Sequence, residues 1–327
     1  ERRSGRLDGG IDVADGDDRT GFDEASGDGR TDALGTAGHE RSATGQVDEF
    51  GEGRIGSGHG ARLRNRPPGP EAGARAGTCW NGRCMTLDIT PSGQACGATV
   101  RGVDLRHLDD DGVTAIRAAW LAHKVLAFPD QQLSDDDLEA FTLRFGPFGD
   151  DPFFASIDGH PHIAAIMRRA DETSSLFAEN WHADWSFQEF PPDGTCLYGK
   201  VIPPSGGDTL YADQQAALAT MPSELRSRIE GRRAIHSARG GYAPDGTYGD
   251  EDAAGDRSMR IRPSADAYAT QTHPLIRTHP ETGAETLYST IGYIIGIEGM
   301  PDDEARPLLG ELYAWQTRDE FQYRHRC

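Results

Sequence analysis

The feature that most constrains how this chain of 327 residues can fold is a change of composition near residue 85. Residues 1–84 hold 19 of the 41 glycines and only ten residues from Val, Ile, Leu, Met, Phe and Trp. Such a segment cannot bury enough apolar surface to offset the entropy lost on ordering, so we predict that residues 1–84 are disordered. Because Met85 follows at once, we favour an upstream start read in error; the alternative is a flexible acidic tail. One folded domain is predicted over residues 85–327.

The charge and cysteine content exclude several classes of protein. The formal net charge is -20, which argues against nucleic acid and anionic membrane as partners because both select a basic face. No apolar run of membrane-spanning length and no signal segment occurs, so we predict a cytoplasmic protein. The five cysteines include no CxxC pair, which argues against a disulfide framework and against a Cys-rich zinc site.

Beyond Met85, short strand signals alternate with a few helical ones. Helical spacing is found over residues 109–124, 134–146 and 302–316, and also over residues 221–231. We predict N-caps at Ser134 and Ser223, each before an acidic residue. Strands are predicted within residues 86–105, 125–128, 182–187, 195–202, 208–213 and 273–289. This pattern predicts a mainly β fold with helices, a sandwich or jelly roll.

The stretch "AENWHADWSF" contains the strongest chemical signal, His182-Ala183-Asp184. If this stretch is extended, alternate side chains lie on one face, so the imidazole and the carboxylate converge on one ion. Two His and one carboxylate form the usual site of non-haem Fe(II) oxygenases, and Trp181 and Trp185 would form a dry wall beside it. The plain alternative is a half-buried His bonded to a carbonyl group, beside a surface Asp.

Several stretches together resemble the taurine dioxygenase and 2,4-dichlorophenoxyacetate dioxygenase family of Fe(II)- and 2-oxoglutarate-dependent oxygenases. They are "ITPSGQACGATVRGVDL", "HKVLAFPDQQLSDDDLEAFTLRFGP", "NWHADWSFQEFPP", "PPSGGDTLYAD" and "THPLIRTHPETGAETLYS", in family order. The resemblance implies a double-stranded β-helix, or jelly roll. It also implies oxidation of a small organic molecule by Fe(II), O2 and 2-oxoglutarate, with release of succinate and CO2.

By position, the resemblance makes His182 and Asp184 the first two iron ligands and makes Thr209 a contact of a 2-oxoglutarate carboxylate. The family's second His and its Arg follow a Trp-Asp-Asn-Arg-like segment, which would lie beyond Cys327. We therefore expect a jelly roll that is incomplete at its C-terminus and, by itself, inactive. His325 lies upstream of the family position, and His273 and His279 are expected to brace a strand and a turn.

The loop "FGPFGDDPFF" bears on the substrate. Asp151 and Phe154 fall where taurine-specific relatives carry a His and a Tyr, and Ala178 falls where they carry an Asn. Because a carboxylate would repel a sulfonate, the resemblance argues against taurine itself. Phe153 and Phe154 either line an apolar pocket or belong to the core.

Three functions remain open. The first is the dioxygenase, the second is a metal-free jelly-roll binding module that lacks the third ligand, and the third is a cupin-like metalloenzyme that does not use 2-oxoglutarate. A homo-oligomer is compatible with all three.

Overall fold

The structure is a computed structural model that describes residues 77–80, 83–204, 206–253 and 255–326. The disorder predicted for residues 1–84 falls mostly on residues 1–76 and 81–82, which lie outside the described residues. Strands β1 (Gly77–Trp80) and β2 (Arg83–Thr86) pair antiparallel, and the second of them spans the boundary expected at residue 85. Among the described residues, no helix has the length and apolar character needed to cross a membrane.

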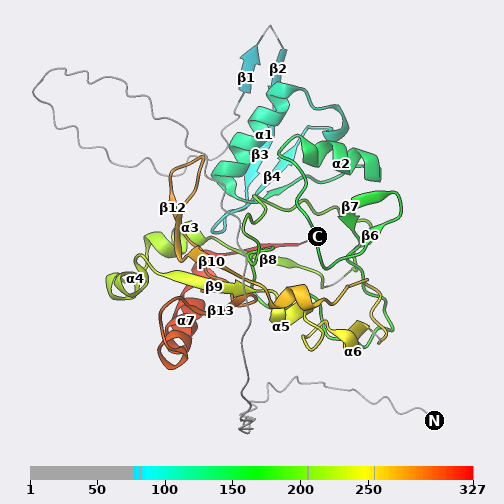
Figure 1. Ribbon diagram of the computed structural model, residues 1–327. Coiled ribbons are helices and arrows are strands. Elements are labelled where there is room, and N and C mark those ends of the chain that lie inside the picture. The colour runs from blue at the N-terminus through cyan, green and yellow to red at the C-terminus, as the bar shows by residue number, and fades with distance from the viewer. Residues whose placement is uncertain (1–76, 81–82, 205, 254, 327) are drawn as a thin grey trace, which may run out of the picture. The chain divides into compact units, whose positions relative to one another are not determined.

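The fold is mainly β with helices, as predicted (Figure 1). The helices are α1 (Asp110–His123), α2 (Asp135–Leu143), α3 (Gln214–Ala219), α4 (Ser223–Ile229), α5 (Arg239–Tyr242), α6 (Asp250–Ala253) and α7 (Asp302–Gln316), with 3-10 turns η1 (Leu105–His107), η2 (Ala265–Tyr268) and η3 (Asp319–Phe321). The strands are β1 (Gly77–Trp80), β2 (Arg83–Thr86), β3 (Asp88–Pro91), β4 (Ala98–Arg101), β5 (Leu126–Ala127), β6 (Ser156–Ile157), β7 (His160–Ala164), β8 (Thr209–Ala212), β9 (Arg233–Ser237), β10 (Thr270–Pro274), β11 (Ile276–Thr278), β12 (Glu285–Leu287), β13 (Ile294–Ile297) and β14 (Gln322–His325).

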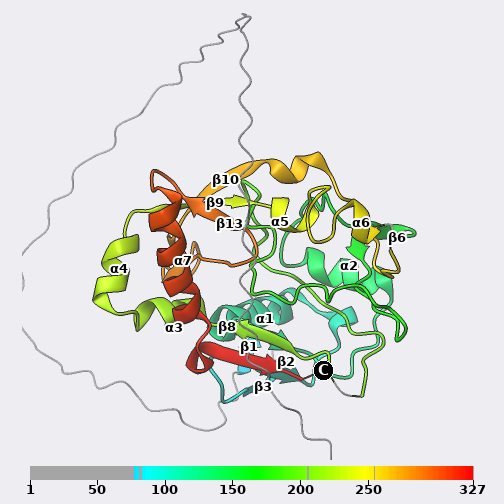
Figure 2. The same ribbon diagram turned by 90° about the horizontal axis from the view of Figure 1, so that it is seen from below.

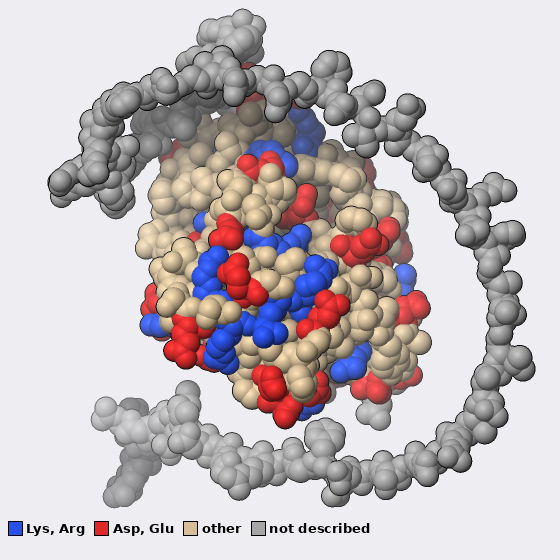
Figure 3. All heavy atoms as spheres, turned by 60° about the vertical axis from the view of Figure 1, so that its left-hand side comes forward, with Lys and Arg blue, Asp and Glu red and all other residues tan. Residues whose placement is uncertain are grey.

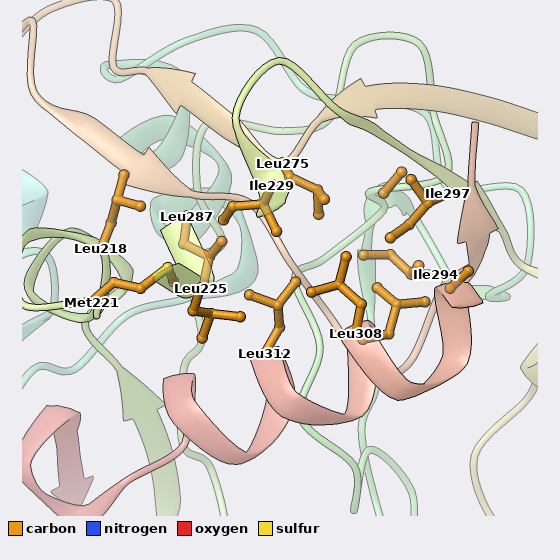
Figure 4. Packing of buried hydrophobic residues seen from close by; sticks show 13 residues of the cluster. Leu218, Met221, Leu225, Ile229, Leu275, Leu287, Ile294, Ile297, Leu308 and Leu312 are labelled. Atoms are coloured by element: carbon orange, nitrogen blue, oxygen red, sulfur yellow. The ribbon is translucent and has the colours of Figure 1, made fainter. Parts of the chain in front are cut away.

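The described strands form six sheets of two or three strands each. In the sheet β10–β9–β13, both neighbours of the central strand run antiparallel to it. Helix α7 packs against this sheet, and Figure 4 shows Leu308 and Leu312 on the helix pointing towards Ile229 and Leu275. The buried cluster around them consists of Leu218, Met221, Leu225, Ile229, Ala234, Leu275, Leu287, Ile294, Ile297, Ala305, Leu308, Leu309 and Leu312.

A second core lies against α1 and α2; Figure 2 shows α2 on the side opposite α4, with α1 near the centre of the view. Here β4 pairs antiparallel with β3 and parallel with β5, and Val100 and Ile116 are buried between sheet and helices. Helix α2 begins as predicted at Ser134, whose hydroxyl accepts from the Asp137 amide while the Asp137 carboxylate accepts from the Ser134 amide. This reciprocal cap satisfies two amides that the helix itself leaves without partners.

Three local predictions were wrong. Residues 182–187 form an irregular segment followed by a turn, and residues 195–202 contain no strand. Strand-forming side chains give a strand only where a neighbouring backbone completes the ladder, and neither segment belongs to a ladder among the described strands. At α4 the N-cap is Pro222, not Ser223, and it makes no side-chain capping bond.

Candidate functional site

His182 and Asp184 converge as the sequence suggested, although by a different backbone path. The imidazole Nε2 lies 3.3 Å from the Asp184 Oδ1, and about a third of each side chain is exposed, 30 % and 37 %. A turn over residues 184–187, rather than strand alternation, produces this approach. Trp185 within the turn has a φ of 49°, a left-handed conformation that costs a residue with a Cβ about 1–3 kcal/mol.

The two polar atoms that face away from the His182–Asp184 contact, Nδ1 and Oδ2, are also hydrogen-bonded. His182 Nδ1 donates to the Asn180 carbonyl oxygen at 2.8 Å, which leaves Nε2 as the nitrogen that faces Asp184. The Thr195 hydroxyl donates to the Asp184 Oδ2 at 2.5 Å. Between the two residues, the Ala183 amide donates to the Thr290 hydroxyl at 3.1 Å. Such outer contacts fix the tautomer and orientation of metal-binding side chains.

The two groups influence each other's ionisation. The hydrogen bond to Asp184 raises the pKa of His182 above its ordinary value, against burial, which lowers it. Burial by itself would raise the pKa of Asp184, but hydrogen bonds from His182 and Thr195 outweigh it and leave the pKa below its ordinary value. One nitrogen donor and one anionic oxygen donor, on side chains that are about a third exposed, fit a borderline divalent ion such as Fe(II).

An aromatic cluster borders the pair. The Tyr293 ring meets the His182 ring edge-on at 6.3 Å, and Phe187 meets Tyr293 at 5.0 Å. Phe154 is buried and stacks on Trp185 at 5.3 Å, so this predicted substrate residue lies directly behind the turn that carries Asp184. Of the two tryptophans expected to form a wall beside the site, Trp185 packs in this cluster, and Trp181 is not among the members given for it.

The other residues predicted for the site, Thr209 and Asp151, lie on different segments from His182 and Asp184. Thr209 is the first residue of β8 and is separated by Asp208 from Gly206 and Gly207, both of which have a positive φ. It stands opposite His325 in the register with β14. The Asp151 carboxylate accepts from the amides of Phe153 and Phe154, both at 3.0 Å, and so caps its own loop. Burial raises the pKa of Asp151.

The remaining histidines have structural contacts. His279 Nδ1 accepts from two amides of the turn between β11 and β12, at Glu281 and Thr282, in agreement with the predicted bracing role. His325 Nδ1 lies 3.1 Å from the Tyr323 hydroxyl. Among the described residues, no third His, Cys, Asp or Glu joins His182 and Asp184 at ligand spacing.

Sequence reasoning missed a second group of possible ligands, Asp136, Glu139 and His160, whose ligand atoms lie within 4.8 Å of one another. Its signal was the i, i+3 spacing of two acids on a predicted helix. Asp136 is 91 % exposed, and His160 Nδ1 lies 3.1 Å from the Glu139 carboxylate. A contact between the His160 ring and the Glu139 carboxylate, which joins α2 to β7, accounts for this grouping, so His182 and Asp184 remain the better candidate centre.

Two surface hollows lie away from this pair. One is lined by Arg228, Arg232, Met300, Glu304, Pro307 and Leu308, and the other by Arg239, Gly240, Asp245, Gly246, Thr247 and Tyr268. Neither lining includes His182 or Asp184, so the chemistry of the donor pair, rather than the depth of a cavity, identifies the site.

Comparison with known proteins identifies the family of the chain. A family profile described as "Taurine catabolism dioxygenase TauD, TfdA family" matches residues 88–327. The chain is 35 % identical over 245 residues to an (S)-phenoxypropionate/alpha-ketoglutarate-dioxygenase of Delftia acidovorans, covering 70 % of this chain and 80 % of the relative. It is 34 % identical over 263 residues to an alpha-ketoglutarate-dependent 2,4-dichlorophenoxyacetate dioxygenase of Cupriavidus pinatubonensis, covering 74 % and 86 %.

A solved structure is similar as well. The crystal structure of a taurine dioxygenase from Burkholderia xenovorans superposes with a TM-score of 0.57 at 29 % identity, covering 74 % of this chain and 76 % of that one. Alpha-ketoglutarate is another name for 2-oxoglutarate, so the names of these relatives state the same co-substrate that the sequence resemblance implied. The chain belongs to the TauD, TfdA family and is a 2-oxoglutarate-dependent dioxygenase.

Proposed function

We propose that this protein hydroxylates a small organic molecule at a centre in which His182 and Asp184 bind Fe(II), with 2-oxoglutarate and O2 as co-substrates. Bound Fe(II) would supply the redox chemistry that couples the decarboxylation of 2-oxoglutarate, to succinate and CO2, with oxidation of the substrate. The observation that carries the proposal is the approach of His182 Nε2 to Asp184 Oδ1, at 3.3 Å. The opposite atom of each group is already hydrogen-bonded, to Asn180 and Thr195.

The protein's own part would be to hold the metal ion and to orient the two side chains that bind it. His182 presents Nε2 because Nδ1 is committed to a carbonyl group, and Asp184 presents Oδ1 because Oδ2 is committed to Thr195. The aromatic cluster would keep water from one side of the centre, since Phe154 and Trp185 stack there. A water-poor surrounding strengthens electrostatic contacts to the bound groups.

We further propose that Thr209 donates to a carboxylate of 2-oxoglutarate and that Asp151 and Phe154 border the substrate. An Asp carboxylate at that position disfavours an anionic sulfonate such as taurine. The third protein ligand would come from a segment other than those described, because the pair recruits no third His, Cys, Asp or Glu within them. We propose that the small sheets are parts of a double-stranded β-helix incomplete within the described residues.

Single-residue variants of the full-length protein test the assignment. Formation of succinate from 2-oxoglutarate is measured with Fe(II) and O2 for His182→Ala and Asp184→Ala. Each variant is expected to lose more than about 100-fold in rate, because losing outer contacts of a metal ligand alone costs 10–100-fold. His107→Ala is the control, since His107 is exposed and its ring contacts Asp104. Unchanged turnover in His182→Ala would contradict the proposal.

The alternatives are separated by two further measurements on the wild type, Fe(II) binding and O2 consumption. A metal-free binding module would bind no Fe(II). A cupin-like enzyme would consume O2 with substrate whether or not 2-oxoglutarate is added.

A further inference from the structure

The segment that carries His182 and Asp184 has no regular structure of its own. Residues 181–190 form neither helix nor strand, so no ladder of backbone hydrogen bonds holds them. Trp185 adopts its left-handed φ of 49° immediately after Asp184. A strained residue of this kind persists only where its surroundings determine its conformation from several sides. The ligand pair therefore depends on anchors that lie outside the segment.

Two histidines on neighbouring strands supply such anchors just after the pair. His236 on β9 places Nδ1 3.0 Å from the Ser186 hydroxyl, and both residues are fully buried, with 0 % exposure. His273 on β10 places Nε2 2.9 Å from the Gln188 carbonyl oxygen. The two rings meet edge to face at 5.2 Å, so they form one unit on the sheet β10–β9–β13.

We propose that His236 and His273 are positioning residues that clamp the segment bearing His182 and Asp184 to the sheet, each through a different ring nitrogen. The proposal rests on the proposed function, because the clamp matters to the reaction only if His182 and Asp184 bind the metal. Neither clamp residue contacts the pair itself, so their effect passes through Ser186 and Gln188.

The environment of the two rings supports directional hydrogen bonds rather than ionic contacts. Burial, with smaller effects of His273 and Arg277, lowers the pKa of His236 to about 3. Burial also lowers the pKa of His273, against hydrogen bonds to the backbone of Gln188 and Ser186. Because the Gln188 carbonyl group can only accept, His273 carries its proton on Nε2. The Nε2 of His236 has no hydrogen-bond partner among the described residues, so Nδ1 makes its polar contact.

This asymmetry allows a crossed substitution experiment. An Asn side chain ends near the place of a histidine Nδ1, and a Gln side chain ends near the place of Nε2; both carry an amide donor and acceptor. His236→Asn and His273→Gln should therefore keep the clamp, whereas His236→Gln and His273→Asn should release it. The clamp should be kept by Asn at position 236 and by Gln at position 273. A protein that simply tolerated Asn better than Gln, or Gln better than Asn, would prefer the same residue at both positions and could not give this pattern.

The readout is hydrogen exchange of the Gln188 amide, which donates to the Trp185 carbonyl group at 2.9 Å inside the turn. In the two mismatched variants we expect exchange about tenfold faster, because a buried hydrogen bond that holds this segment is lost. In the two matched variants exchange should stay within about threefold of the wild type. Amides in α7 are the internal control and should not change in any variant. Equal exchange at Gln188 in all four variants, or the same preferred amide at both positions, overturns the clamp.

A variant that fails to fold will show faster exchange in α7 as well. In that case Ser186→Ala decides, because it removes the His236 contact from the segment side and leaves both histidines in the sheet. If the Gln188 amide exchanges faster in Ser186→Ala while the α7 amides exchange as in the wild type, the clamp is supported. If neither the Gln188 amide nor the α7 amides change, the clamp is overturned.

Titration with Mn(II) as a substitute ion separates this inference from the proposed function. Wild type and His182→Ala are compared first, and weaker binding in His182→Ala supports the metal centre. The mismatched variants should then bind Mn(II) about 10–100-fold more weakly than the matched ones. Loss of a hydrogen bond that orients a metal ligand has an effect of about this size. If the wild type binds no Mn(II), the metal assignment fails, while the exchange pattern still decides whether the clamp exists. If Mn(II) binds equally to matched and mismatched variants, the positioning role is overturned.

Discussion

At the scale of single residues, the Asp184 carboxylate is held by two neighbours of different origin. His182 lies two positions before it, and the sequence pattern was sufficient to identify that partner. Thr195 lies eleven positions after it and donates to Oδ2 from a segment without regular structure. Sequence reasoning chose Thr209 as the important hydroxyl and gave no role to Thr195. No motif in a single sequence marks Thr195, because its contact arises from the path of the loop.

Thr195→Val should weaken metal binding and turnover about 10–100-fold, as for other outer contacts of a ligand, because Asp184 would lose the bond that fixes its orientation. Thr195→Ser keeps the hydroxyl group and should stay close to the wild type. Mn(II) titration and succinate formation measure the two effects. Equal activity of the Val and Ser variants would show that the hydroxyl group plays no part.

At the scale of elements, the segment between β7 and the ligand pair is fastened to residues 256–258 by a buried carboxylate. Glu172 is 7 % exposed and accepts from the Ser258 amide at 2.9 Å and from the Ser174 hydroxyl at 2.5 Å. On the same segment, the Thr173 amide donates to Asp256 at 2.7 Å. The sequence showed these residues only as polar loop positions, and the fold gives them a shared function in holding the loop.

Glu172→Gln should lower the melting temperature at pH 7 more than at pH 3. Hydrogen bonds from Ser174 and Ser258 lower the pKa of Glu172 from 4.5 to about 2. A lowered carboxylate pKa gives stability that is fully present above about pH 4.5 and is lost as the pH falls towards 2. Melting curves from pH 3 to pH 7 measure the difference from the wild type.

Glu179→Gln is the control for this series, because Glu179 is exposed. It should leave the melting curve unchanged at each pH. A difference between wild type and Glu172→Gln that does not change with pH would contradict the linkage.

At the scale of the whole molecule, stability comes from the packed cores rather than from the surface charges. Figure 3 shows acidic and basic side chains interleaved on one face, and pairs such as Arg228 with Glu311 and Arg233 with Glu298 join exposed groups. Exposed ion pairs contribute only about 0–1 kcal/mol each. The buried cluster beneath α7 removes a continuous apolar surface from water, which favours folding more strongly.

Leu312→Ala should destabilise the protein by about 2–5 kcal/mol, because truncation leaves a cavity in a packed core. Leu312 has 0 % exposure within the cluster. Leu143→Ala is the matched control, since Leu143 is 51 % exposed, and it should change the free energy of unfolding by less than about 0.5 kcal/mol. Urea unfolding measures both. A cost for Leu312→Ala equal to that of the control would mean that this cluster does not carry the stability.

The sequence by itself determined the elements whose signals are local. Helix α7 covers the predicted residues 302–316, α2 begins at the predicted cap Ser134, and the Gly206-Gly207 turn leads into β8. Periodicity, capping and positive-φ glycines act over a few residues, so a single sequence contains them. The sequence also indicated His182 and Asp184 as partners, because their spacing is short.

Only the tertiary structure decided how that pair is built. The stretch around Asp184 was predicted as a strand and is a turn, because strand formation depends on a neighbouring backbone that local sequence does not specify. The contacts of Thr195 with Asp184 and of His236 with Ser186 join residues 11 and 50 positions apart. Such contacts exist only after the chain has brought distant segments together, and they convert two adjacent side chains into an oriented donor pair.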